Sequence, residues 1–136
     1  MEEEMEIMEM AMANAEIRTL VDGYFTMWNE TDAAQRQAVI AAVWSDGARY
    51  VDPMFAVQGA DELSAMVAGV HEQFPGHRFR LSGPIDAHHD RAHWEWELVG
   101  PDGASPIVSG VDFAVFAPDG RLNSVTGFFT QAPGAA

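Results

Sequence analysis

Residues 61–85 of the chain read DELSAMVAGVHEQFPGHRFRLSGPI, and the spacing of the apolar residues changes in the middle of this stretch. In the first half they recur every three or four residues, as on one side of a helix: Leu63, Met66, Val67, Val70 and Phe74. Pro75-Gly76 interrupts this pattern, and the residues that follow alternate with a period of two. The stretch therefore predicts a helix that is capped by Asp61 and stops at Pro75, followed by a strand over 78–85.

Two further helices are predicted before residue 61. The first covers about Asn14 to Asn29, because six apolar residues share one stripe at helical spacing: Ile17, Leu20, Val21, Tyr24, Phe25 and Trp28. The second opens at Asp32, which forms a capping box with Gln35, and it runs to about Trp44 before Asp46-Gly47 ends it. A short extended segment, residues 48–53, is expected between the second and third helices.

Strands dominate the rest of the chain, and alternation places them at 78–85, 92–99, 107–116 and 122–130. The Pro-Asp-Gly sequences at 101–103 and 118–120 have the chemistry of tight reversals, so the last three strands should form an antiparallel meander. Helices first and strands afterwards predict an α+β fold.

The chain has 136 residues, which is the length of one domain, and we assign that domain to residues 14–130. Residues 1–13 form an acidic, Met-rich extension, and residues 131–136 are expected to be a frayed tail. Five glutamates in the first ten residues are the opposite of the basic start of a signal peptide, and no apolar run approaches the roughly 20 residues of a membrane span. We therefore expect a cytoplasmic protein with no membrane partner.

Charge and composition exclude several classes of function. The net charge of −14 argues against nucleic acids and anionic membranes, because both bind through clustered cations. The chain has no cysteine, and all seven basic residues are arginine, so disulfides, thiol nucleophiles and Schiff-base lysines are excluded. Gly-rich phosphate loops, nucleophile elbows and zinc-protease motifs are also absent, and we expect no cofactor.

A cluster of potential metal ligands lies at Asp86, His88, His89, Asp90 and His93. Most of these residues fall in a predicted turn between two strands, where polar side chains point into solvent in different directions, so we predict no metal site. His71 and His77, at the end of the third helix, are expected on the surface.

One carboxyl group interrupts an apolar strand, in Val111-Asp112-Phe113-Ala114-Val115-Phe116. A charge on a buried strand face costs several kcal/mol unless it is paired or protonated. Asp112 is therefore either a functional acid or part of a solvated edge strand. Asp52 and Tyr24 also have structural explanations, since an Asp before Pro53 forms turns and Tyr24 lies on the buried stripe of a helix.

At these three residues the chain resembles the cone-shaped nuclear transport factor two-like superfamily, which includes ketosteroid isomerases and SnoaL-like polyketide cyclases. The similarity covers about Ile17 to Phe129 and implies three helices packed on a curved antiparallel sheet around an internal apolar pocket. Residues 51–55 (VDPMF) resemble the isomerase segment with the proton-shuttling base, and 59–63 (GADEL) the start of the next helix. The stretch from Val111 to Phe113, followed by Phe116, Asp119-Gly120-Arg121 and Phe128-Phe129, resembles the segment that begins with the oxyanion-binding Asp. Tyr24 falls where the isomerases place their oxyanion-binding Tyr.

The resemblance implies an enolisation site. Asp52 would remove a proton next to a carbonyl, while Tyr24 and a protonated Asp112 would donate hydrogen bonds to the enolate oxygen. The implied ligand is small, apolar and carbonyl-containing, and the pocket residues that we expect to contact it are Phe25, Trp28, Phe55, Met66, Trp94, Trp96, Phe116, Val125 and Phe129.

Two features depart from the isomerase pattern. First, Trp94 and Trp96 stand where the isomerases have smaller residues, and their rings could fill the pocket. Second, the polyketide cyclases use an Asp/His pair, and in this chain such a pair would require Asp112 to meet His93. A protein of this fold that binds a ligand without turnover, or that serves in dimerisation, is therefore an alternative. An epoxide-opening hydrolase would need an Asp-Arg-Asp set, and no Arg shares the face of Asp112. Val111, Phe113 and Val115, on the other face, predict a homodimer through the sheet.

Overall fold

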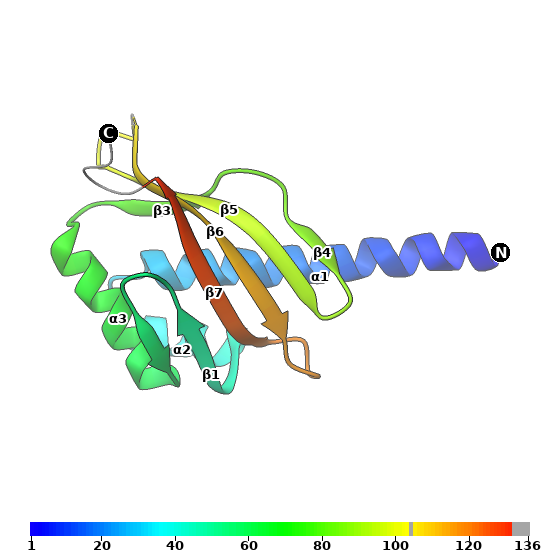
Figure 1. Ribbon diagram of the computed structural model, residues 1–136. Coiled ribbons are helices and arrows are strands. Elements are labelled where there is room, and N and C mark those ends of the chain that lie inside the picture. Colours follow the sequence, from blue (N-terminus) through cyan, green and yellow to red (C-terminus); the bar gives the residue numbers. More distant parts are fainter. Residues whose placement is uncertain (104, 132–136) are drawn as a thin grey trace.

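The computed structural model describes residues 1–103 and 105–131 and contains three helices and seven strands in an α+β arrangement (Figure 1). The helices are α1 (Glu2–Asn29), α2 (Ala33–Val43) and α3 (Ala60–Gln73). The strands are β1 (Trp44–Val51), β2 (Ala56–Gln58), β3 (Arg78–Leu81), β4 (Asp86–His88), β5 (Arg91–Val99), β6 (Pro106–Phe116) and β7 (Leu122–Gln131). Gln131, predicted as the start of the frayed tail, is the last residue of β7, and the rest of that tail, 132–136, lies outside the described residues.

All seven strands belong to one curved, unclosed sheet in the order β2-β1-β7-β6-β5-β3, with β4 paired to β5. The meander β5-β6-β7 is antiparallel as predicted. The sheet is nevertheless mixed, because β1 runs parallel to β7. The helices pack on one side of this sheet, with α1 crossing behind it in Figure 1, and the buried side chains of both layers form the core.

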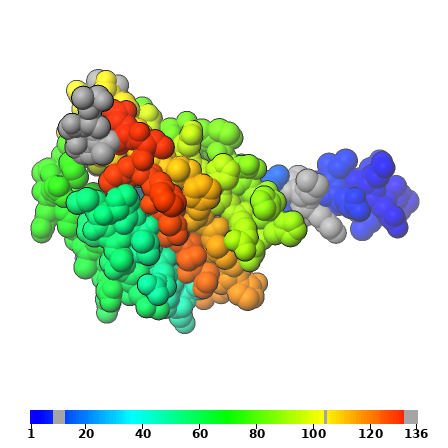
Figure 2. All heavy atoms as spheres, in the orientation of Figure 1, coloured from blue at the N-terminus to red at the C-terminus, as the bar shows by residue number. Residues whose placement is uncertain are grey.

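α1 begins near residue 2, not near residue 14 as predicted. Glu, Met and Ala are strong helix formers and no Gly or Pro interrupts them, so the helix continues into the acidic extension. Glu2, Glu3 and Glu4 lie in its first turn, where negative charge stabilises a helix. This end of α1 projects from the body of the molecule (Figures 1 and 2).

The boundary between α2 and β1 also differs from the prediction. α2 ends at Val43, β1 begins at Trp44, and Asp46-Gly47 lies inside the strand. The pairing of β1 with β7 shifts register between Trp44 and Arg49, and Gly47 has a φ of 68°. A strand bulge thus contains the residues that we had expected to end a helix.

Only the first half of the predicted strand over 78–85 forms, as β3, and β4 lies in the segment predicted as a turn. Ser82-Gly83-Pro84 ends β3 at Leu81, and β4 then forms a hairpin with β5. β2 was not predicted, because three residues are too few for a periodicity. At α3 the N-cap is Gly59, with a φ of 86°, and Asp61 lies in the first turn instead of capping it. No helix in the described part of the chain has the length and apolar character of a membrane span.

Candidate functional site

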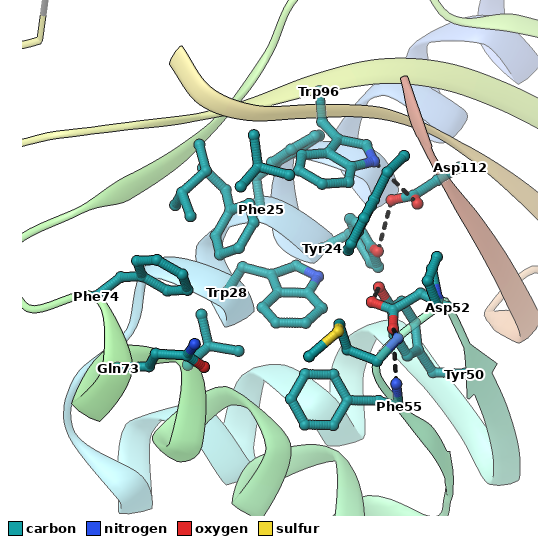
Figure 3. A pocket seen from close by; sticks show the side chains of 17 residues that line it. Tyr24, Phe25, Trp28, Tyr50, Asp52, Phe55, Gln73, Phe74, Trp96 and Asp112 are labelled. Carbon is teal, nitrogen blue, oxygen red and sulfur yellow. Dashed lines mark hydrogen bonds between the residues drawn. The ribbon is translucent and has the colours of Figure 1, made fainter. Parts of the chain in front are cut away.

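A cavity of about 400 Å³ opens between the helices and the concave face of the sheet (Figure 3). Its wall is mostly aromatic: Tyr24, Phe25, Trp28, Tyr50, Phe55, Phe74, Phe79, Trp96 and Phe129. Two carboxyl groups, Asp52 and Asp112, also line it, while none of the lining residues within the described chain is Arg, Lys or His. An apolar pocket with a few convergent polar groups is the usual form of a small-molecule site.

Asp112 occupies the deep end of the cavity and is 3% exposed. Tyr24 Oη donates a hydrogen bond to its Oδ2 atom at 2.7 Å, and Trp96 Nε1 donates to Oδ1 at 3.1 Å (Figure 3). Burial raises the pKa of Asp112 to about 7, against the opposing effect of the Tyr24 and Trp96 hydrogen bonds; the nearby Asp52 raises it further. Near neutral pH a large share of Asp112 is therefore the neutral acid.

The sheet creates the space for this carboxyl group with glycine. Gly127 lies opposite Asp112 in the β6–β7 register, and a Cβ atom there would be 2.8 Å from Asp112 Oδ1. Gly110 lies opposite Trp96, and a Cβ there would collide with the indole ring. Both glycines let the two side chains lie flat against the sheet and meet.

Tyr24 reaches the same point from the buried stripe of α1. Burial, the nearby Asp112 and Tyr50, and the hydrogen bond to Asp112 all raise the pKa of Tyr24 well above its ordinary value of 10.0. Its hydroxyl is therefore a neutral donor throughout the physiological range.

Asp52 follows the last residue of β1 and lines the cavity. Its Oδ1 atom accepts hydrogen bonds from the backbone N–H groups of Met54 and Phe55, both at 2.8 Å. Its Oδ2 atom accepts one from Tyr50 Oη at 2.6 Å. The turn-forming role that the Asp-Pro sequence indicated is thus real, and it coexists with a position on the pocket wall.

The number of protons at the deep end decides what the site can bind. When Asp112 is neutral, the Tyr24 hydroxyl and the Asp112 carboxyl each carry one proton, and the hydrogen bond between them uses only one of these two protons. The other proton can then be donated to a ligand oxygen. When Asp112 is ionised, the Tyr24 proton is committed to the carboxylate and no proton is spare. The neutral pair can thus donate one hydrogen bond to an oxygen atom of a molecule in the cavity.

The structure brings Tyr24, Asp52 and Asp112 to one cavity, with Phe25, Trp28, Phe55, Trp96 and Phe129 on its wall. Four predicted ligand contacts lie elsewhere among the described residues. Met66, Val125 and Trp94 are buried in the core, where the Trp94 ring lies 5.3 Å from that of Tyr24. Phe116 is at the far end of β6, in a separate groove with Leu20 and Arg121.

The histidines contribute nothing to this cavity. His93 lies on the opposite face of the sheet, where its Nε2 atom is 3.3 Å from Asp86 Oδ2, so it does not pair with Asp112. Within the described residues no three His, Cys, Asp or Glu side chains are placed to hold a metal ion. His71 and His77 are both partly exposed, and His71 Nε2 lies 2.6 Å from the carbonyl oxygen of Trp28.

Three features of the cavity were not predicted from the sequence. Tyr50 shares a strand face with Asp52, two residues away, and strict alternation could have revealed it. The donor role of Trp96 and the open space at Gly127 depend on strand register, which the sequence did not give.

Comparisons with known proteins agree with this fold. A model described as a SnoaL-like domain matches residues 21–125. A structure from Agrobacterium tumefaciens, named as a candidate isomerase of the SnoaL-like family, is 32% identical with a TM-score of 0.80, covering 85% of this chain and 97% of that one. No curated protein matches the chain significantly.

More distant structures share the fold alone. A candidate SnoaL-like polyketide cyclase from Jannaschia is 21% identical with a TM-score of 0.61, covering 82% of this chain and 85% of that one. A cystatin-like protein of unknown function from Nostoc punctiforme is 14% identical with a TM-score of 0.68, covering 88% and 92%. The domain model spans most of this chain, and the match to the Agrobacterium structure covers nearly the whole length of that structure. This protein therefore belongs to the SnoaL-like family.

Proposed function

We propose that the cavity binds a small, apolar, carbonyl-containing molecule and that the protein is a cofactor-free isomerase or cyclase acting by proton transfer. The observation that carries this proposal is the 2.7 Å hydrogen bond between Tyr24 and the buried carboxyl of Asp112, inside an aromatic cavity. Such a pair has little structural reason to be buried on a strand face, because a well-packed apolar pair would cost less.

In this proposal Asp52 takes a proton from the carbon next to the carbonyl. The electrons of the broken C–H bond form the C=C bond of an enolate, and the negative charge moves to the oxygen, where Tyr24 and Asp112 donate hydrogen bonds. Return of the proton to a different carbon completes an isomerisation. Attack of the enolate carbon on a second carbonyl of the same ligand completes a cyclisation.

The exchange of α-protons for deuterium tests this chemistry without knowledge of the natural substrate. 2-Tetralone in D₂O is a suitable probe, followed by proton NMR. We expect the wild-type protein to accelerate exchange above the buffer rate and Asp52→Asn to abolish the acceleration. Asp52→Asn should still bind 2-naphthol, an analogue of the enolate, measured by quenching of Trp28 and Trp96, which line the cavity.

A second candidate is a binding protein without turnover. It is favoured by the hydrogen bonds of Asp52, since three donors from the turn and Tyr50 already occupy its two oxygens. Binding of 2-naphthol with no exchange of 2-tetralone would support this reading and remove the catalytic one. The Asp-Arg-Asp set of an epoxide hydrolase is not assembled, because none of the described lining residues is Arg.

A further inference from the structure

We propose that Tyr50 is a positioning residue for Asp52, whose hydroxyl donates to the carboxylate before proton transfer and turns toward the Asp112 end of the cavity after it. This inference rests on the proposed function, because it assigns Asp52 the role of the base. It adds a residue that neither the sequence nor the resemblance pointed to.

The hydrogen bonds of Asp52 distinguish its two oxygens. Oδ1 is held by the backbone N–H groups of Met54 and Phe55, which fixes the plane of the carboxyl group. Oδ2 has one side-chain donor, Tyr50 Oη at 2.6 Å. An ionised carboxylate oxygen can accept two hydrogen bonds, so Oδ2 keeps one position at which a proton can arrive.

Tyr50 also lies close to the other carboxyl group. A Cβ atom at Gly127 would be 2.8 Å from Asp112 Oδ1, 3.3 Å from Asp52 Cβ and 3.5 Å from Tyr50 Oη. Tyr50 Oη and Asp112 Oδ1 therefore lie no farther apart than the sum of the 3.5 Å and 2.8 Å distances, and Gly127, which has no side chain, leaves the space beside them open. Burial and the two nearby aspartates raise the pKa of Tyr50 well above 10.0, which keeps its proton available for donation.

The proton count of the step balances. A proton leaves the ligand carbon and bonds to Asp52 Oδ2, while the C–H electrons move into the enolate. Rotation about the C–O bond of Asp52 then turns this O–H group toward Tyr50 Oη, to which it donates, and the Tyr50 hydroxyl turns its own proton toward the Asp112 end. Return of the proton to the ligand reverses each of these changes.

The bond itself can be tested without any ligand, because the chain has two tyrosines. In protein labelled with ¹³Cζ-tyrosine, Tyr24→Phe and Tyr50→Phe assign the two resonances. We expect Asp52→Asn to shift the resonance of Tyr50 much more than that of Tyr24, and Asp112→Asn to shift Tyr24 strongly. A Tyr50 resonance that does not respond to Asp52→Asn would overturn the proposal.

The turning of the Tyr50 hydroxyl away from Asp52, called its release below, is tested with Tyr50→Phe, which keeps the ring and removes only the oxygen. The measured quantity is the rate at which the protein exchanges the α-protons of 2-tetralone for deuterium. We expect about a tenfold loss in kcat, the scale of one neutral hydrogen bond, with KM changed less than threefold. An unchanged or faster rate would mean that Tyr50 only restrains the base, and this would overturn the release. If the wild-type protein exchanges no protons, the proposed function and the release fail together, and the tyrosine resonances alone judge the bond.

Discussion

At the scale of single residues, Asp112 makes stability depend on pH. Its pKa is about 7 in the folded protein and 3.8 without the fold. Between these values the folded state keeps a proton that the unfolded state has lost, so stability falls as pH rises from about 4 to about 7. Above pH 7 this group adds no further change.

Replacing Asp112 by Asn removes this dependence while keeping a side chain of the same shape. Urea unfolding of the wild type and Asp112→Asn at pH 5 and pH 8 measures the effect, because all other groups cancel in the difference. We expect the free energy of unfolding of the variant, minus that of wild type, to be larger at pH 8 than at pH 5 by on the order of 3 kcal/mol. Parallel behaviour at both pH values would show that Asp112 is ionised throughout.

Asp112→Ala tests the donor role. We expect it to weaken binding of 2-naphthol by about 1 to 3 kcal/mol, since the ligand oxygen loses a buried hydrogen bond. In Asp112→Asn the amide still donates, so binding should persist. Equal affinities in wild type and Asp112→Ala would remove Asp112 from the ligand site.

Gly127 should not tolerate a methyl group. The Cβ of Gly127→Ala would press on Asp112 and Asp52, and we expect a loss of about 1 to 3 kcal/mol in stability, with weaker binding of 2-naphthol. Gly69→Ala in α3 is the matched control, because nothing lies within 4 Å of its Cβ position. The control should gain roughly 0.5 to 1 kcal/mol from helix propensity.

At the scale of elements, α1 has two parts. Its C-terminal part carries Tyr24 to Asp112, while the side chains of residues 1–8 are exposed. A chain that begins near Ala13 should therefore unfold within about 0.5 kcal/mol of the full length, as measured by thermal melting. A loss of several kcal/mol would mean that the acidic segment packs on the body.

Much of the element order follows from periodicity alone. The stripe from Ile17 to Trp28 places Tyr24 toward the sheet, and the alternation around Asp112 buries its side chain, so both could be found from the sequence. The positions of strand ends could not, since Gly47 looks like a helix stop and is in fact part of a bulge. Trp96 and Gly127 meet Asp112 only through the pairings of three strands, and these registers depend on loop lengths and on bulges that local patterns do not reveal.

At the scale of the whole molecule, the outer face of the sheet carries an apolar patch on β6 and β7. Phe113 and Phe128 are 47% and 54% exposed, and their rings lie 6.1 Å apart with Val111 and Val115 on the same face of β6. We propose that a second copy of the chain covers this face. Light scattering at micromolar concentration should give twice the monomer mass of 14.9 kDa.

Phe113→Asp should convert this dimer to a monomer, because a charge would be buried at its centre. Ile7→Asp is the control, since Ile7 is also a large apolar residue and is 65% exposed, but lies on the projecting end of α1. A monomeric wild type, or dimers that persist in Phe113→Asp, would rule out this face.

The position of β7 has a consequence for synthesis of the chain. Among the strands that the structure describes, β7 is the last to leave the ribosome, yet it lies between β1 and β6 near the middle of the sheet. Until it emerges, β1 and β6 each present an unpaired edge, and the deep wall of the cavity lacks the strand that contains Gly127. The nascent protein therefore cannot complete its sheet before β7 has emerged, and until then chaperones or aggregation at these two open edges would compete with folding.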